Sequence, residues 1–187
     1  MSVAPYPDWI IPPAEGYTAE DLDRLPDLPP HTELLDGSLI FVSPQTKFHV
    51  RTKRLLDRAL EAAVPEGWEV WPEMSVTLDR QNRPEPDLLV VDVASDTGHL
   101  QTNFGAEHVL LAIEVVSQES RVRDREVKPR KYAAAGIPHF WRVECDEGRP
   151  VVHTYEIDPA TRLYGLTGIH HKQLKVDRPF PVDIDLT

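Results

Sequence analysis

Cysteine is nearly absent from this chain, because Cys145 is the single cysteine among 187 residues. One cysteine cannot form an internal disulfide, and this usage fits a reducing compartment such as the cytosol. We predict that Cys145 packs in the core as a small apolar side chain and has no reactive role.

Long apolar runs are missing as well. No stretch approaches the ~20 apolar residues that a transmembrane helix requires, and the N-terminal sequence MSVAPYPDWIIPP lacks the basic and apolar regions of a secretory signal. We therefore expect a cytoplasmic protein with no membrane partner. The sequence also contains no zinc-ligand pattern, phosphate-binding glycine loop, Ser-His-Asp signature or internal repeat, which excludes the function classes that depend on them.

Positive charge is scarce. The chain has 20 Lys and Arg against 31 Asp and Glu, for a net charge of −11, and this balance argues against broad, non-specific affinity for nucleic acid. Two segments, 46–58 and 121–131, nevertheless carry +4 each and leave −19 on the remainder. Such basic faces could position a phosphate backbone, or they could simply be solvated helix faces.

The length and the 41% hydrophobic content suit one globular domain with a substantial core. Residues 1–30 hold seven of the 18 prolines, and we predict an extended arm there with one short helix between Thr18 and Leu25. The arm could pack on a partner subunit or cover the core. Residues 31–187 are predicted to form a single domain.

Apolar periodicity predicts both helices and strands in this chain, as in an α/β protein. Asp36-Gly37 is a strong turn signal between two short strands, and residues 46–63 carry the apolar stripe of an amphipathic helix. A second helix is expected to end at Gly136. Strands are predicted at 32–35, 39–42, 69–78, 88–93, 109–116 and 139–144, with two or three more between 151 and 176.

Two of these strands contain acidic residues in strongly apolar surroundings. Glu114 lies inside the run VLLAIEVV, and a lone buried carboxylate costs several kcal/mol unless a cation, a proton or a strong donor accompanies it. Asp87 lies at the start of the preceding predicted strand, 88–93, so pairing of the two strands would bring both carboxylates together. Such a pair suits Mg²⁺, which prefers oxygen ligands. The alternative is structural: Asp87 caps a turn and Glu114 pairs with a core arginine.

A lysine-bearing helix follows the Glu114 strand. Asp124, Lys128 and Tyr132 are spaced by four and should share one helix face. Pro129 is comfortable only in a first turn, so we predict that the helix begins near Lys128 and leaves this lysine mobile at the helix entrance.

Three further polar residues are candidates for supporting the same site. Ser117 and Ser120 stand where the chain leaves the Glu114 strand, where they could cap the following turn or contact a bound phosphate; capping is the commoner use. His49 lies near the start of the 46–63 helix. We expect it to make a structural hydrogen bond, with a phosphate or water contact as the alternative.

Four ordered segments together resemble a known family. They are HTELLDGSLIFVSP at 31–44, Pro86-Asp87, AIEVVS around Glu114, and DREVKPRKYAAAGIPHFW from Asp124 to Trp141. This set is similar to a bacterial family of restriction-endonuclease-like proteins in the PD-(D/E)xK nuclease superfamily. The resemblance covers roughly residues 30–145 and implies an α/β fold with a restriction-endonuclease-like core, in which helices flank a central mixed β-sheet.

The resemblance also implies a function and a division of roles. The activity would be metal-dependent hydrolysis of nucleic acid, as a DNA endonuclease using Mg²⁺ or Mn²⁺. Asp87, Glu114, the main-chain carbonyl of Val115 and Glu33 would hold the metal, and Lys128 would be the catalytic lysine.

Departures from the superfamily pattern leave alternatives open. Val116 stands where the superfamily lysine normally follows the glutamate, and Gln118 and Glu119 replace a usual Pro-Ser pair. One alternative is therefore an inactive module that binds nucleic acid or protein, and another is hydrolysis of a smaller phosphodiester. A homodimer would provide two sites for cutting two strands.

Overall fold

A six-stranded mixed sheet forms the centre of the computed structural model, which describes residues 7–187. Its strand order is β10-β9-β8-β7-β5-β3, and all neighbours are antiparallel except the parallel pair β7–β8. The bounds are β3 (Trp68–Pro72), β5 (Leu88–Asp92), β7 (Val109–Val115), β8 (His139–Asp146), β9 (Arg149–Ile157) and β10 (Tyr164–His170). The predicted α/β class with a mixed central sheet is thus confirmed.

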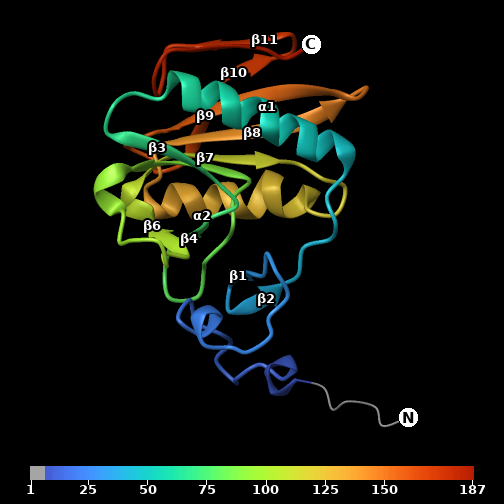
Figure 1. The fold of residues 1–187 in the computed structure, drawn as a ribbon, viewed down its shortest axis with the longest axis vertical. Coiled ribbons are helices and arrows are strands. Elements are labelled where there is room, and N and C mark those ends of the chain that lie inside the picture. Colours follow the sequence, from blue (N-terminus) through green and yellow to red (C-terminus); the bar gives the residue numbers. More distant parts are fainter. Residues whose placement is uncertain (1–6) are drawn as a thin grey trace.

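Helices cover the two faces of this sheet (Figure 1). Helix α1 (Lys47–Ala63) packs Leu56 and Leu60 into one apolar cluster, together with the hairpin of β11 (Gln173–Val176) and β12 (Val182–Asp185). Helix α2 (Lys128–Ala135) packs Tyr132 into a second cluster on the opposite face. Because strand side chains alternate between faces, β5 and β7 contribute to both clusters.

The predicted strand 69–78 is two strands. Glu73 has a φ of 52°, a left-handed conformation that L side chains rarely adopt, and the chain turns there between Pro72 and Ser75. The short strand β4 (Ser75–Thr77) then pairs in parallel with β6 (Asn103–Gly105), outside the central sheet.

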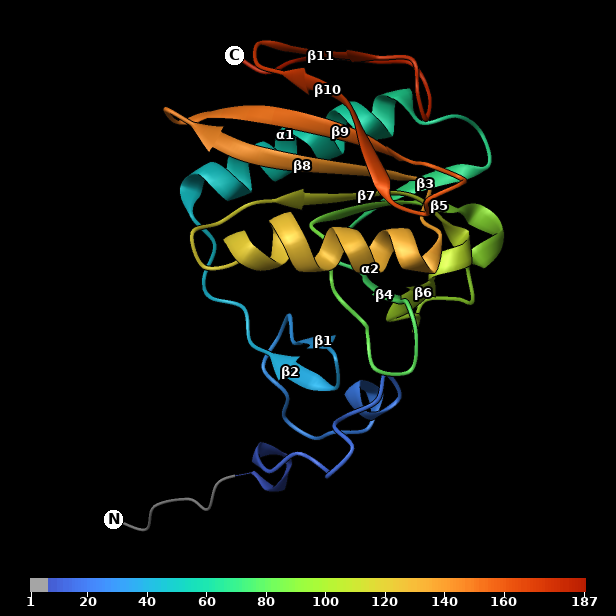
Figure 2. The ribbon, with the colours of Figure 1, turned by 180° about the vertical axis from the view of Figure 1, so that it is seen from behind.

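The predicted hairpin at Asp36-Gly37 is confirmed as β1 (Glu33–Leu35) and β2 (Ser38–Ile40). Both turn residues have positive φ, 49° and 72°, as the right-handed twist of a tight hairpin requires. Figures 1 and 2 show this hairpin below the central sheet, at the end of the molecule opposite β11.

The proline-rich arm packs against the hairpin where the structure describes it. The main-chain N–H of Tyr17 donates to the Gly37 carbonyl at 2.8 Å, and Tyr17 and Ala19 form a small apolar cluster with Leu34. The predicted short helix is a 3-10 turn at Asp21–Asp23. Residues 1–6 of the arm lie outside the described residues, and the division into an arm and one domain stays a prediction. Further 3-10 turns lie at Asp8–Ile10, Val93–Ser95 and Ala106–His108.

Helix α2 begins at Lys128, but this residue is not a mobile helix entrance. A π-helical turn at Arg123–Val127 precedes α2 without a break, and Lys128 is 3% exposed. Pro129 cannot donate to the carbonyl four residues earlier, and the wider turn lies directly before it. The predicted mobility is therefore wrong, because upstream helical turns enclose the lysine.

Two expectations concern the surface. Cys145 is exposed and not a core residue, because it lies near the end of β8, beyond the apolar clusters, and pairs with Pro150 next to the β8–β9 turn. Within residues 7–187, no helix combines the length and the apolar composition needed to cross a bilayer.

Candidate active site

Pairing of β5 and β7 brings Asp87 and Glu114 together, as expected. Leu88 lies opposite Ile113 in this antiparallel pair, so Asp87 and Glu114 each stand one residue further along at the same end. The Oδ2 atom of Asp87 accepts a hydrogen bond of 2.7 Å from the Val115 main-chain N–H. The two carboxylates therefore enter the same cavity.

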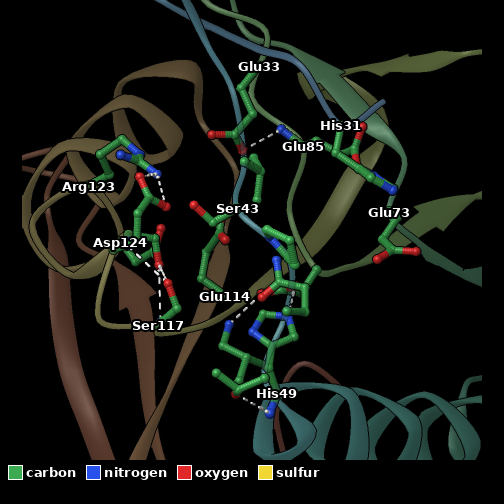
Figure 3. Close-up of a pocket in the computed structure, with 18 of the residues that line it drawn as sticks. His31, Glu33, Ser43, His49, Glu73, Glu85, Glu114, Ser117, Arg123 and Asp124 are labelled. Carbon is green, nitrogen blue, oxygen red and sulfur yellow. Dashed lines mark hydrogen bonds and ion pairs between the residues drawn. The ribbon is translucent and has the colours of Figure 1, made fainter. Parts of the chain in front are cut away.

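This cavity has a volume of about 520 Å³ and is rich in acidic side chains (Figure 3), four of which belong to the residues predicted from the sequence and come from separate elements. Glu33 belongs to β1, Asp87 precedes β5, Glu114 belongs to β7, and Asp124 belongs to the π-helical turn. Further lining residues are His31, Thr46, His49, Glu73, Glu85, Val115, Ser117, Ser120, Arg123 and Lys128.

The ammonium of Lys128 lies among three of the carboxylates. Its Nζ atom is 2.6 Å from Oε1 of Glu33, 3.0 Å from Oε1 of Glu114 and 3.6 Å from Oδ1 of Asp124. All four side chains are at most 4% exposed. The Tyr132 hydroxyl also donates to Oε1 of Glu114 at 2.5 Å. Asp124, Lys128 and Tyr132 thus face the same interior, as their spacing predicts.

Val116 follows Glu114 by two residues but supplies no cation. It is 8% exposed, and its main-chain N–H donates to the Val143 carbonyl at 2.8 Å. The lysine of the next helix instead places an ammonium beside Glu114, so the site has a buried cation despite the valine.

Burial and crowding of like charges set the protonation of the cluster. Burial raises the pKa of Glu114 well above its usual value, with the carboxylates of Asp124, Asp87 and Glu33 adding to the shift and Lys128 opposing it. Burial likewise raises the pKa of Asp124 to about 6, against Lys128 and the hydrogen bond from Ser120. One ammonium does not balance this many carboxylates, so the cluster favours an added proton or cation.

The pKa values of Lys128 and Tyr132 also shift in the directions expected for buried groups beside carboxylates. Burial alone would lower the pKa of Lys128, but the carboxylates of Glu114, Glu33 and Asp124 outweigh it and raise the pKa well above the usual range. Burial and the nearby Glu114 carboxylate raise the pKa of Tyr132. The lysine is therefore a fixed positive charge, and the phenol is a fixed donor.

His49 makes the structural hydrogen bond that its position predicts. The ring is 3% exposed, and its Nε2 atom lies 2.5 Å from Oδ1 of Asp87. Helix α1 positions it, since the Thr46 side chain accepts from the His49 main-chain N–H at 3.2 Å and caps the helix. Both carboxylate oxygens of Asp87 are therefore hydrogen-bonded, Oδ1 to His49 and Oδ2 to the Val115 main-chain N–H.

Ser117 and Ser120 form a local capping arrangement at the cavity wall. The Ser117 main-chain N–H donates to Oγ of Ser120 at 3.1 Å, and the Ser120 N–H donates to Oγ of Ser117 at 3.0 Å. The Ser120 hydroxyl also donates to Asp124. These serines therefore close the turn after β7 and hold Asp124 in place.

Four ionisable cavity residues were not predicted from the sequence: His31, Glu73, Glu85 and Arg123. Glu85 donates its main-chain N–H to Oε1 of Glu33 at 3.0 Å, and its carboxylate is hydrogen-bonded to Nδ1 of His31. Burial raises the pKa of Glu85, and the bond to Glu85 raises that of His31. Two signals were present, because Glu85 directly precedes Pro86-Asp87 and His31 lies two residues before Glu33. The sequence gives no such signal for Glu73, because its position at the cavity depends on the left-handed backbone conformation that ends β3.

The donors at this site fit a hard divalent cation by type and by charge. In the described part of the chain, no group of three or more His, Cys, Asp or Glu side chains is already arranged around a metal position. Buried oxygens nevertheless lack hydrogen-bond partners, namely Oε2 of Glu33 and Oδ1 of Asp124. Carboxylate oxygens in excess of the available positive charge are what Mg²⁺ and Mn²⁺ prefer.

Comparisons with known proteins agree with this fold. A solved structure from Anabaena variabilis, described as "a putative nuclease belonging to DUF820", matches with a TM-score of 0.68 and 17% sequence identity, over 87% of this chain and 89% of that one. The cAAA-bound NucC of P. aeruginosa matches with 12% identity over 67% of this chain and 85% of that one, but its TM-score of 0.35 is too low to indicate a shared fold. No curated protein matches the sequence.

The family model Uma2, described as "Putative restriction endonuclease", matches residues 19–187. This confirms the family and the restriction-endonuclease-like fold that the motifs indicated. Since the match spans nearly the whole sequence, the chain belongs to the Uma2 family.

Proposed function

We propose that the protein is a divalent-metal-dependent endonuclease that hydrolyses phosphodiester bonds of DNA. One feature supports this most directly: three carboxylates from separate elements meet around Lys128, and Asp87 enters the same cavity of about 520 Å³. A protein rarely buries so much like charge without a use for it. The family and the nuclease-like fold support the same reaction class.

Mg²⁺ or Mn²⁺ would be held by Asp87, Glu114, Glu33 and the main-chain carbonyl of Val115. When bound, such a cation neutralises charge on the phosphodiester and lowers the pKa of the attacking water. His49 and the Val115 main-chain N–H fix the orientation of Asp87, which is how outer partners tune a metal ligand.

Lys128 would act as a fixed positive charge. Because its pKa is raised, the ammonium stays protonated at neutral pH and cannot act as a base. It would instead orient the attacking water and stabilise the negative charge that develops on the phosphoryl oxygens. Glu33 and Asp124 hold the ammonium from two sides, and Ser120 holds Asp124. A homodimer would place two such sites on the two strands of a duplex.

A second function is also tested, because several polar groups of the site already have partners within the protein. Both oxygens of Asp87 already have hydrogen-bond partners, and Lys128 is paired with Glu33 and Glu114. These contacts favour an inactive module that binds nucleic acid or protein and keeps the ion cluster for structural reasons. The two functions differ in one respect, which is divalent-dependent cleavage.

The deciding experiment is cleavage of a supercoiled plasmid with Mg²⁺ or Mn²⁺, compared with EDTA. We expect nicked and linear products that disappear with EDTA and fall about 100-fold or more in Asp87→Asn and Glu114→Gln. Asp177→Asn, at an exposed position outside the cavity, is purified in parallel and should cleave like the wild type. Equal cleavage by all variants would identify a contaminant, and no cleavage by any would favour the inactive module. Turnover of bis(p-nitrophenyl) phosphate without plasmid cleavage would indicate a smaller substrate.

A further inference from the structure

The outward face of α1 carries a straight stripe of four cations: Lys47, Arg51, Arg54 and Arg58. Their spacing of four, three and four residues places them in one line along the helix. All four are exposed. The opposite face of α1 is buried through His49, Thr52, Leu56 and Leu60, so the stripe points away from the protein.

The stripe has no internal charge partner. Some cations elsewhere are paired, such as Arg125 with Glu144 and Lys131 with Asp36, whereas the stripe gathers four cations on one helix that are unpaired within residues 7–187. No member of the stripe has a carboxylate within 4 Å among the side chains that the structure describes. Lys47–Arg51 and Arg54–Arg58 are instead like-charge pairs at a spacing of four, which destabilises a helix. An external anion would relieve this repulsion.

The stripe begins at the catalytic cavity. Thr46 and His49, at the N-terminal end of α1, line that cavity. Further along the helix, Arg51, Arg54, Leu55 and Arg58 line a surface hollow of about 470 Å³. A chain of phosphates that enters the cavity can therefore continue past the N-terminus of α1 and onto the stripe.

We propose that this stripe is a track for the sugar–phosphate backbone of the nucleic acid whose scissile bond enters the cavity. The substrate class rests on the proposed function. From Lys47 to Arg58 the helix rises about 16 Å, which corresponds to the axial rise of about five phosphates on one strand. Contacts of this kind fix position but carry no sequence information, so the track selects a polyanion and no particular sequence. It also gives an acidic protein a local surface for a polyanion.

Binding of a fluorescent 20-base-pair duplex, measured by anisotropy in EDTA across a KCl series, tests the track without cleavage. The double variant Arg54→Gln/Arg58→Gln removes two charges at the end of the stripe farther from the cavity. We expect the slope of log K against log[KCl] to fall in magnitude by about 1.8, since each lost phosphate contact removes ~0.9. Arg54→Lys/Arg58→Lys keeps the charges and should keep the slope.

The matched control is Arg149→Gln/Lys172→Gln, which makes the same change in net charge at exposed positions outside α1. Its slope should equal that of the wild type. An equal fall in both glutamine variants, an unchanged slope in the α1 variant, or no duplex binding by the wild type overturns the track. Binding to phosphatidylserine vesicles in place of the duplex overturns it in favour of a membrane surface. Because EDTA prevents metal-dependent cleavage, failure of this test is distinct from failure of the nuclease proposal.

Discussion

The ammonium of Lys128 is within 3.6 Å of three buried carboxylates, so its removal should leave these charges uncompensated. We predict that Lys128→Met lowers the free energy of unfolding by about 3–5 kcal/mol at pH 7.5, the usual cost of breaking a buried ion pair. The loss should shrink toward pH 5, because protonation of the carboxylates relieves it. Urea unfolding in EDTA at the two pH values measures both effects.

Lys131→Met is the matched control for this loss. Lys131 pairs with Asp36, whose side chain is 73% exposed, and such surface pairs contribute at most about 1 kcal/mol. The control should therefore lose little stability, with no marked dependence on pH. A loss in Lys128→Met as small as that in Lys131→Met would mean that the carboxylates are already protonated in the wild type.

The raised pKa of Asp124 predicts how the free energy of unfolding depends on pH. Its pKa is about 6 in the folded protein and 3.8 as the ordinary value, so the folded state binds the proton more tightly. The free energy of unfolding should therefore fall by up to about 3 kcal/mol as pH rises from 4 to 6, then level off. Asp124→Asn cannot titrate, and its stability relative to the wild type should rise over the same window. Unfolding in EDTA at intervals from pH 4 to pH 7 measures this difference.

Asp158 provides a control, because its contribution to stability should depend on pH in the opposite direction to that of Asp124. Main-chain N–H groups of Thr161 and Ala160 lower its pKa, so its contribution to stability is present above the unfolded pKa and lost in acid. Asp158→Asn should therefore lose stability relative to the wild type as pH rises. A parallel trend in both asparagine variants would show that the Asp124 effect is not specific to the buried cluster.

The β1–β2 hairpin matters because it carries Glu33 into the cavity. Gly37 has a φ of 72°, and a Cβ there would lie 3.0 Å from Nε2 of Gln81 and 3.2 Å from Cα of Gly16. We predict that Gly37→Ala costs about 1–3 kcal/mol through strain at this backbone conformation, with crowding by the arm in addition. Thermal unfolding measures the cost, and the cleavage assay should show reduced activity if the hairpin shifts Glu33.

Gly148→Ala separates strain from crowding. Gly148 has a similar φ of 82° in the β8–β9 turn, but a Cβ there meets nothing within 4 Å. Both variants should lose stability through the backbone, and the excess loss in Gly37→Ala reports crowding against Gln81 and the arm. Equal losses would show that crowding against Gln81 and Gly16 contributes nothing.

Most elements of this fold follow from local patterns in the sequence. The Asp36-Gly37 turn, the amphipathic α1 and the apolar runs of β5 and β7 are each fixed by their own residues. Two features are not local. The strand break at Glu73 needs a left-handed residue held by the fold, as in the hydrogen bond from its main-chain N–H to the Asp87 carbonyl. The β11–β12 hairpin depends on packing against α1 and was not predicted as a separate sheet.

The central residues of the candidate site were predictable from the sequence, but several lining residues and the contacts of Lys128 were not. Asp87 and Glu114 stood out because carboxylates are costly in apolar strands. The partners of Lys128 depend on the π-helical turn that precedes it and encloses its side chain. Pro129 alone predicts a helix that starts near Lys128 and leaves this lysine mobile. His31 and Glu85 carry little signal in the sequence, because their roles depend on folding of the β1–β2 hairpin against the segment before β5. There Leu34 pairs with Arg83, and Glu33 accepts from the Glu85 main-chain N–H.

The molecule as a whole combines an acidic body with a concentrated negative site, and this leads to a prediction about metal. A divalent cation that binds the cluster must displace the protons that burial favours on Asp124 and Glu114. Affinity should therefore weaken as pH falls from 7 to 5, by up to about tenfold per pH unit for each proton displaced. Calorimetric titration of Mn²⁺ in buffers of different ionisation enthalpy measures both the affinity and the proton release.

The same titration distinguishes the two proposed functions without any choice of substrate. Saturable binding by the wild type should be lost in a folded Glu114→Gln variant and kept in Asp177→Asn, and binding should also raise the unfolding temperature of the wild type by mass action. Absence of binding, even with a short duplex present to complete the coordination shell, would mean that Lys128 and bound protons together neutralise the cluster. The ion network would then be structural, and the protein would be an inactive binding module with a nuclease-like fold.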